Sequence, residues 1–237
     1  FREFLLDRAS IYFTLDELKE IRKLGACLAE QSGEIMAAAG LLAKAEEWQV
    51  LTEMINRQAS SLLNQGRHQT LQEAIALLPE EIVNQEPWLL YWQGMSHVLF
   101  APQEAKKNFE QAFDRFQVNN DSLGLFLACA GVIEAYAYSE DNIKPVIVWA
   151  EKLQYLFREY GDVLSPEIEL KLLASLHGFI YAAPHHPFLE ILEQRFCDLQ
   201  HSESDPSLKI AAAATMIWLP LWRGDKKKSR RIIDETN

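Results

Sequence analysis

The sequence predicts an all-α fold, namely a right-handed α-α superhelix of tetratricopeptide-like helical hairpins. Apolar residues recur at every third or fourth position along nearly the whole chain, as at Leu18, Ile21 and Leu24. This is the spacing of one helix face, whereas a strand alternates with a period of two. Turn signals recur at intervals of about 34 to 45 residues, which is typical of helix-turn-helix solenoids. We therefore expect stacked pairs of helices.

Each pair is expected to open with a longer helix at a start signal. Thr14 and Glu17 have the spacing of a capping box, which predicts a helix that begins near Thr14 and ends near Ser32, before Gly33. The other first helices are expected to begin at Trp48, Pro87, Asp121, Pro166 and Pro206. A turn and a second helix should follow each of them. Since one hairpin cannot bury its apolar face alone, neighbouring hairpins should stack.

Small residues predict where the expected helices approach closely. Each lies a few residues before a turn that ends a first helix, and they are Gly94, Gly131, Ala174 and Ala214. The corresponding turns are expected near Ala101, Ser139, Ala182 and Arg223. On the second helix after Pro87, the residues Ala105, Phe109 and Ala112 have the small-aromatic-small spacing of a tetratricopeptide B helix. Small side chains at one level let adjacent helix backbones come together.

Composition and charge exclude several classes of protein. The 237 residues carry a formal net charge of −11, which repels a phosphate backbone, so we expect no direct contact with nucleic acid. No apolar run reaches the roughly 18 residues of a membrane span, and no membrane contact is expected. The cysteines Cys27, Cys129 and Cys197 are far apart. We interpret them as free thiols in the core, which favours a reducing cytoplasm.

Several short strings resemble one family of regulators. Residues Phe1 to Leu6 resemble the end of the winged-helix module in STAND-class signal-transducing ATPases related to the maltose-regulon activator. The later strings resemble family members with a bacterial transcriptional activator domain, and they are Gly33 to Trp48, Leu62 to Gly66, Thr70 to Leu71, Leu78 to Pro79, Pro87 to Trp92, Gly124 to Ala128, Ser165 to Glu169, His186 to Pro187 and Trp222 to Asp225. The resemblance covers nearly the whole chain.

The resemblance implies a domain organisation and a set of partners. Residues 1–13 would end a preceding winged-helix module, and residues 14–237 would form the repeat domain, as a fragment of a longer cytoplasmic protein. The sequence lacks the Gly-x-x-x-x-Gly-Lys loop that cradles phosphates. ATP hydrolysis and DNA binding would therefore belong to other domains of the parent chain, and no cofactor is expected in this fragment. In such regulators the superhelix senses a small effector or a protein partner.

Lone polar groups on the first helices predict a binding surface. Glu134 is the only charged residue between Asp121 and Glu140, and His177 interrupts an apolar run. Because an unpaired buried carboxylate is unfavourable, Glu134 should either be paired or face a wet groove. Counted back from the turns, His97 lies at the fourth position, whereas Glu134, His177 and Trp218 lie at the fifth.

These positions suggest one face of successive helices, with amphipathic aromatic residues nearby. The predicted ligand-binding residues are Tyr91, Trp92, His97, Glu134, Tyr138, His177 and Trp218. The alternative is that the aromatic side chains, including Tyr136 and Tyr181, only pack between helices, with the Glu134 carboxylate either reaching solvent or hydrogen-bonded to His177.

Two other polar groups have simpler interpretations. His185 and His186 lie between prolines and would need His201 to form a metal site, so we interpret them as a turn with solvated imidazoles. The basic block Lys226–Lys228, with Arg230 and Arg231, is interpreted as the solvated face of a final helix whose Ile232 and Ile233 pack inward. The alternatives are contact with nucleic-acid phosphates and contact with an acidic surface in the C-terminal part of the parent chain. No metal, nucleophile or calcium motif occurs, so we expect neither a metal site nor an enzyme.

Three functions remain open. The leading hypothesis is a sensor or interaction module of a bacterial transcriptional activator, which binds an effector or a partner protein on the concave face of the superhelix. The second is a scaffold through which the regulator self-associates as a homodimer, with no ligand pocket. The third, a helical hydrolase that uses Glu134 and His177, lacks a recognisable nucleophile.

Overall fold

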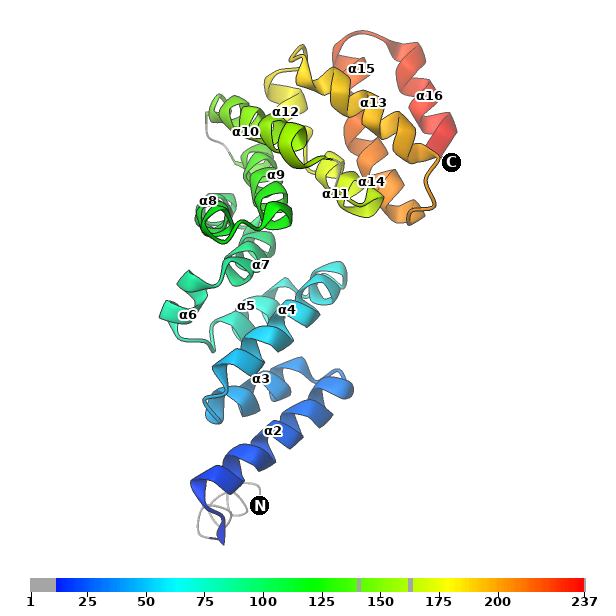
Figure 1. Ribbon diagram of the computed structural model, residues 1–237. Coiled ribbons are helices and arrows are strands. Elements are labelled where there is room, and N and C mark those ends of the chain that lie inside the picture. Colours follow the sequence, from blue (N-terminus) through cyan, green and yellow to red (C-terminus); the bar gives the residue numbers. More distant parts are fainter. Residues whose placement is uncertain (1–11, 140–141, 162–163, 237) are drawn as a thin grey trace. The chain divides into compact units, whose positions relative to one another are not determined.

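The computed structural model describes residues 12–139, 142–161 and 164–236, and every regular element in these ranges is a helix (Figure 1). The prediction of an all-α fold built from helical repeats is therefore confirmed. The string Phe1 to Leu6, and most of the winged-helix end expected over residues 1–13, lie outside the described residues. The chain divides into two compact units, of which the first ends at Ser96 and the second begins at His97.

The first unit contains α2 (Leu15–Gln31), α3 (Ile35–Lys44), α4 (Trp48–Asn64), α5 (His68–Ile75), α6 (Glu80–Gln85) and most of α7 (Pro87–His97). The predicted starts at Thr14, Trp48 and Pro87 are confirmed. Thr14 Oγ1 accepts a hydrogen bond from the Glu17 N–H at 3.2 Å, and Glu17 Oε2 accepts one from the Thr14 N–H at 2.7 Å. Gly33, at φ 77°, then ends the helix in a conformation that glycine adopts without strain.

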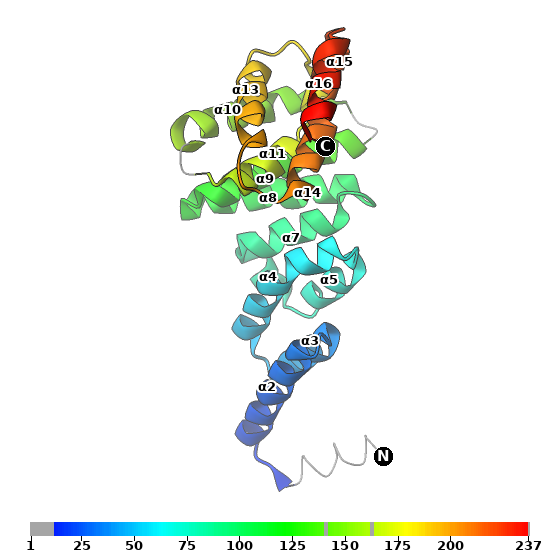
Figure 2. The ribbon, with the colours of Figure 1, turned by 90° about the vertical axis from the view of Figure 1, so that its right-hand side faces the viewer.

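The second unit contains α8 (Pro102–Asn119), α9 (Ser122–Tyr138), α10 (Pro145–Tyr160), α11 (Pro166–Ala174), α12 (His177–Ala182), α13 (Phe188–Gln200), α14 (Pro206–Met216), α15 (Trp218–Trp222) and α16 (Lys226–Thr236). Three of its helices begin at the predicted places, since Asp121, Ser165 and Asp205 cap α9, α11 and α14. Their side-chain oxygens accept hydrogen bonds from backbone N–H groups at 2.9, 3.4 and 2.8 Å. Helices α8 and α9 lie side by side in both views (Figures 1 and 2).

Two glycines allow close helix contacts in the second unit. The Phe109 ring of α8 lies against Gly131 of α9, where an added Cβ would be 2.8 Å from the ring. Gly178 brings α12 onto α9, because a Cβ there would lie 2.6 Å from the backbone oxygen of Ile133. Gly131 was expected to permit such an approach, whereas Gly178 was not singled out. Of the other small residues, Ala214 is exposed and Ala174 is partly buried.

Two first helices are interrupted, which the periodicity did not predict. Between α11 and α12, Ser175 Oγ donates to the backbone oxygen of Lys171 at 3.2 Å, a bond four residues back that bends helices. Between α14 and α15, Pro220 has no N–H to donate to the carbonyl of Met216, so a continuous helix is disfavoured there. As a result, His177 and Trp218 are each the first residue of a short helix.

The expected positions of the cysteines need a correction. Cys129 is buried, and its Sγ donates to the backbone oxygen of Trp149 at 3.2 Å. Cys27 and Cys197 are exposed, so their assignment to the core is wrong. Both lie on the solvent-facing sides of amphipathic helices, where three- and four-residue spacing of neighbouring apolar residues does not imply burial. No disulfide joins these cysteines.

The basic block also differs in part from its prediction. Ile232 is buried on α16, but Ile233 is 48% exposed, because consecutive residues are rotated by about 100° around a helix. Lys228 Nζ lies 2.8 Å from Glu193 Oε1 of α13, so this lysine is paired. In the proline-flanked turn, His186 Nδ1 accepts a hydrogen bond from the Phe188 N–H at 3.2 Å and this imidazole is partly buried, so of the two histidines only His185 is exposed.

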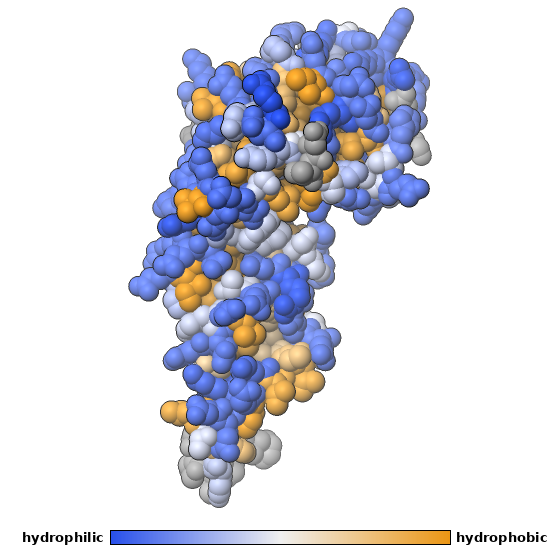
Figure 3. All heavy atoms as spheres, in the orientation of Figure 1, coloured by the Kyte–Doolittle hydropathy of each residue, from blue (hydrophilic) through white to orange (hydrophobic). Residues whose placement is uncertain are grey.

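The surface shown in Figure 3 carries apolar side chains in separate groups between hydrophilic ones. Among the described residues, no helix combines the length and the apolar character needed to cross a bilayer.

Candidate functional site

A small cavity lies where the first helices of three successive hairpins meet in the second unit. Its volume is about 140 Å³, and it is lined by residues of α9, of the α11–α12 pair and of the α14–α15 pair, which are Glu134, Ala137, Tyr138, Ala174, Ser175, His177, Ala214, Thr215 and Trp218. The set includes Glu134, Tyr138, His177 and Trp218, which the sequence predicted as ligand-binding. Counting back from the turns therefore identified residues that do lie together.

The local sequence explains why this space is open. Ala137, Ala174 and Ala214 contribute one small residue from each first helix, so no long side chain fills the level between Glu134 and Trp218. Thr215 Oγ1 donates to the backbone oxygen of Ala174 at 2.7 Å. This bond satisfies a carbonyl at the end of α11, which the helix break leaves without its usual partner, and it ties α14 to α11.

Glu134 supplies the electrostatic character of the cavity. Burial raises the pKa of its carboxyl above the ordinary value for glutamate, and a hydrogen bond with Ser175 opposes part of that rise. The pKa of Tyr138 is also raised, mainly because the side chain is partly buried and to a lesser extent because the Glu134 carboxylate is near. The cavity thus holds an acceptor whose charged form is poorly solvated, which favours an occupant that donates a hydrogen bond or carries positive charge.

Aromatic side chains line the cavity and continue one turn further along α12 and α15. The ring centroids of His177 and Trp218 are 5.9 Å apart, and those of Tyr181 and Trp222 are 5.7 Å apart in an edge-to-face arrangement. These aromatic side chains remain open to solvent, with exposed fractions of 51% for Tyr138, 60% for Tyr181, 44% for Trp218 and 51% for Trp222. We call these four residues the first-helix aromatic face.

The other three predicted site residues lie elsewhere. Tyr91 is buried on α7 and packs with Trp88 and Trp92, at centroid distances of 5.7 and 4.9 Å. His97 does not line the cavity, and its Nε2 lies 3.8 Å from Glu104 Oε2. A residue four positions before its turn points about 100° away from one at the fifth position, which is a physical reason for the different place of His97.

The contacts within the cavity bear on the two alternatives for Glu134 and His177. Across the described residues, no hydrogen bond joins the His177 ring to Glu134 or to Ser175, and the side chain that lowers the pKa of Glu134 is Ser175. Ser175 is the only hydroxyl beside His177 among the lining residues of α11 and α12. Its Oγ donates to Lys171, and no hydrogen bond between a hydroxyl and the His177 ring occurs among the described residues.

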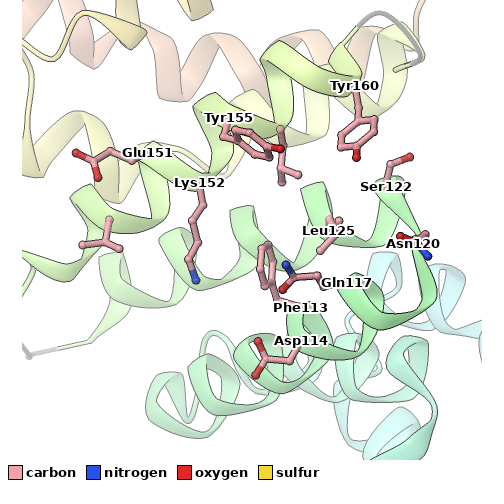
Figure 4. Close-up of a pocket in the computed structure, with 12 residues that line it drawn as sticks. Phe113, Asp114, Gln117, Asn120, Ser122, Leu125, Glu151, Lys152, Tyr155 and Tyr160 are labelled. Atoms are coloured by element: carbon pink, nitrogen blue, oxygen red, sulfur yellow. The ribbon is translucent and has the colours of Figure 1, made fainter.

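Sequence reasoning missed a larger groove in the second unit. It has a volume of about 720 Å³ and lies between α8, the start of α9 and α10 (Figure 4). Tyr155 and Tyr160 of α10 point toward α8, from which Phe113 and Gln117 project (Figure 4). Lys152 Nζ lies 3.8 Å from the centroid of the Trp149 ring, a cation–π contact. The residues alternate with core positions along ordinary amphipathic helices, so no sequence signal distinguished them.

Comparison with known proteins adds no relative: no family model matches the chain, and no curated protein matches its sequence.

Proposed function

We propose that this chain is the sensor or interaction module of a bacterial transcriptional activator, and that its first-helix aromatic face binds a polypeptide segment of a partner protein. The resemblance of its sequence to STAND-class regulators supports the cellular role. The observation that carries the binding role is the gathering of Glu134, Tyr138, His177 and Trp218 around one cavity. Three successive hairpins contribute to it, so an occupant would contact all of them.

The size of the cavity favours a polypeptide over a whole effector molecule. Small-molecule sites usually enclose about 300–1,000 Å³, whereas this cavity has about 140 Å³, which accommodates one side chain. The exposed tyrosines and tryptophans of the first-helix aromatic face extend the contact area beyond that volume. Tyr and Trp are enriched among the residues that carry most of the energy of protein interfaces, so the aromatic face suits apolar residues that flank the inserted side chain.

The chemistry of the cavity favours a lysine, arginine or amide side chain as the inserted group. Glu134 is an acceptor in surroundings that raise its pKa, and a donor would compensate for the lost hydration. The net charge of −11 adds a long-range attraction for a basic segment. Signalling would then be a population shift, in which the segment favours the arrangement of the three hairpins that it contacts best.

A peptide library displayed on phage tests this function. Selection against the wild-type protein is expected to enrich peptides that combine a basic or amide residue with apolar neighbours. Their affinities should fall at least about tenfold on Glu134→Gln or Trp218→Ala, a loss of about 1.4 kcal/mol. Glu159→Gln changes an exposed carboxylate on α10 and serves as the matched control. If no peptide is enriched, or if selected peptides bind the variants as well as the wild type, the proposal is wrong.

A further inference from the structure

A separate cavity lies in the first unit, along one side of α4. Its volume is about 550 Å³, and its lining residues are Trp48, Gln49, Thr52, Glu53 and Asn56 of α4, Ile82 of α6 and Glu86, which directly follows α6. The α4 residues recur at three- and four-residue spacing, so they share one face of the helix. The cavity thus presents a continuous strip of α4 beside the end of α6.

Two polar atoms of this strip lack partners. The Thr52 side chain lines the cavity and is only 9% exposed, and its Oγ1 is buried without a hydrogen bond. Asn56, one helical turn further along, likewise has a buried Oδ1 without a partner. Buried polar atoms are nearly always paired in folded proteins, because an unpaired one has lost its hydration without compensation. Both atoms belong to residues that line the cavity, so an occupant with hydrogen-bond donors could supply the missing partners after a small rotation of either side chain.

The charges around the cavity are of one sign. Glu53 and Glu86 are both exposed at its edge, and no lysine or arginine is among its lining residues. Gln49 Nε2 donates to Glu53 Oε1 at 3.1 Å and occupies part of that carboxylate. Arg57, the cation one turn beyond Glu53 on α4, does not line the cavity; it is paired with Glu30 of α2 at 3.0 Å and also attracts Glu53. The carboxylates of the cavity are therefore not neutralised by a lining residue.

We infer that this cavity binds a guanidinium or ammonium group, as carried by an arginine or lysine side chain of a polypeptide. Glu53 and Glu86 supply the opposite charge, while Thr52 and Asn56 supply oxygen acceptors. The indole ring of Trp48 adds a π-face of the kind that cations favour. This site is independent of the aromatic face of the second unit, so either can fail without the other.

The test follows the indole N–H signal of Trp48 in the full chain by nitrogen-15 NMR, with Trp48→Phe to assign it. The probes are an acetylated and amidated Gly-Arg-Gly peptide, the same peptide with neutral citrulline in place of arginine, and methylguanidinium chloride. The arginine peptide should shift the signal in a saturable manner, and the citrulline peptide should bind at least about tenfold more weakly. Binding of methylguanidinium with equal affinity would show that a free small cation is sufficient, whereas weaker binding would identify the polypeptide as the source.

Variants separate the cavity from general charge attraction. The double variant Glu53→Gln with Glu86→Gln and the isosteric Thr52→Val should each weaken binding of the arginine peptide, by about tenfold or more for the double variant. Glu81→Gln, which removes an exposed carboxylate of α6 outside the cavity, should leave it unchanged. Equal binding of the arginine and citrulline peptides by the wild type, or an unmoved Trp48 signal, would overturn the inference even if a variant failed to fold.

Discussion

Glu134 shows how one residue links binding to stability. Burial raises the pKa of its carboxyl in the folded chain, so the folded state holds its proton more tightly than the unfolded state does. The folded state is then penalised as the pH rises from the ordinary pKa of glutamate through the raised pKa. A residue that weakens the free protein in this way is typical of a site that awaits a partner.

Glu134→Gln should therefore stabilise the free protein at neutral pH. The amide keeps a hydrogen-bonding group beside Ser175 but needs no proton to remain neutral. Urea unfolding across pH 3.5 to 8 is expected to show no difference between the variant and the wild type at the acidic end, and a growing advantage of the variant that levels off above the raised pKa. A variant that is less stable than the wild type at pH 8 would show that the carboxylate is well compensated in the free protein.

Single residues also mark the limit of prediction from the sequence. Glu134, His177 and Trp218 share one offset from their turns, and the structure brings them together. Tyr91 was predicted as a binding residue only because it lies near His97 in the sequence, and in the structure its side chain is buried. The unpaired atoms of Thr52 and Asn56 depend on where α6 ends relative to α4, which no spacing within one helix encodes.

At the scale of helices, local chemistry determined what could be predicted. The starts of α2, α9, α11 and α14 have polar capping residues or prolines, and all of them were found. The breaks inside two first helices were missed. They arise from Ser175, whose hydroxyl donates to the Lys171 carbonyl, and from Pro220, and neither residue changes the three- and four-residue spacing of the apolar side chains. These breaks place His177 and Trp218 at the starts of short helices, so they shape the cavity itself.

The contact between α12 and α9 should be intolerant of a single methyl group. Gly178→Ala would place a Cβ 2.6 Å from the backbone oxygen of Ile133, and backbone atoms cannot yield as a flexible side chain can. We expect a loss of about 2 kcal/mol in the free energy of unfolding, measured with urea and circular dichroism.

The matched control for this substitution is Gly40→Ala. Gly40 lies inside α3 with no atom within 4 Å of an added Cβ, so alanine should stabilise by about 0.5–1 kcal/mol through helix propensity. If Gly178→Ala were as benign as Gly40→Ala, the close approach of α12 and α9 would be refuted.

At the scale of the whole molecule, the net charge of −11 and the exposed aromatic face have opposite effects on association between copies of the chain. Like charges on two copies repel, whereas the aromatic face favours burial. We expect the chain to remain a monomer at physiological ionic strength, because its proposed partner is a basic segment and not a second copy. Light scattering over a wide range of protein concentration should give a constant mass.

Self-association would have a distinct result in the same experiment. A mass that rises with concentration in the wild type, and stays constant in Trp222→Ala, would assign the aromatic face to contact between copies. The scaffold hypothesis would then replace the binding of a partner segment. Loss of the association at low salt but not at high salt would further identify charge repulsion as the force that opposes it.

The most direct test of the central claim is a map of NMR chemical-shift changes when a library-selected peptide is added to the full chain. The account predicts that the largest changes cluster on the C-terminal half of α9, on α12 and on α15, around Glu134, His177 and Trp218. Changes confined to the groove between α8 and α10, with the first-helix aromatic face unaffected, would contradict it.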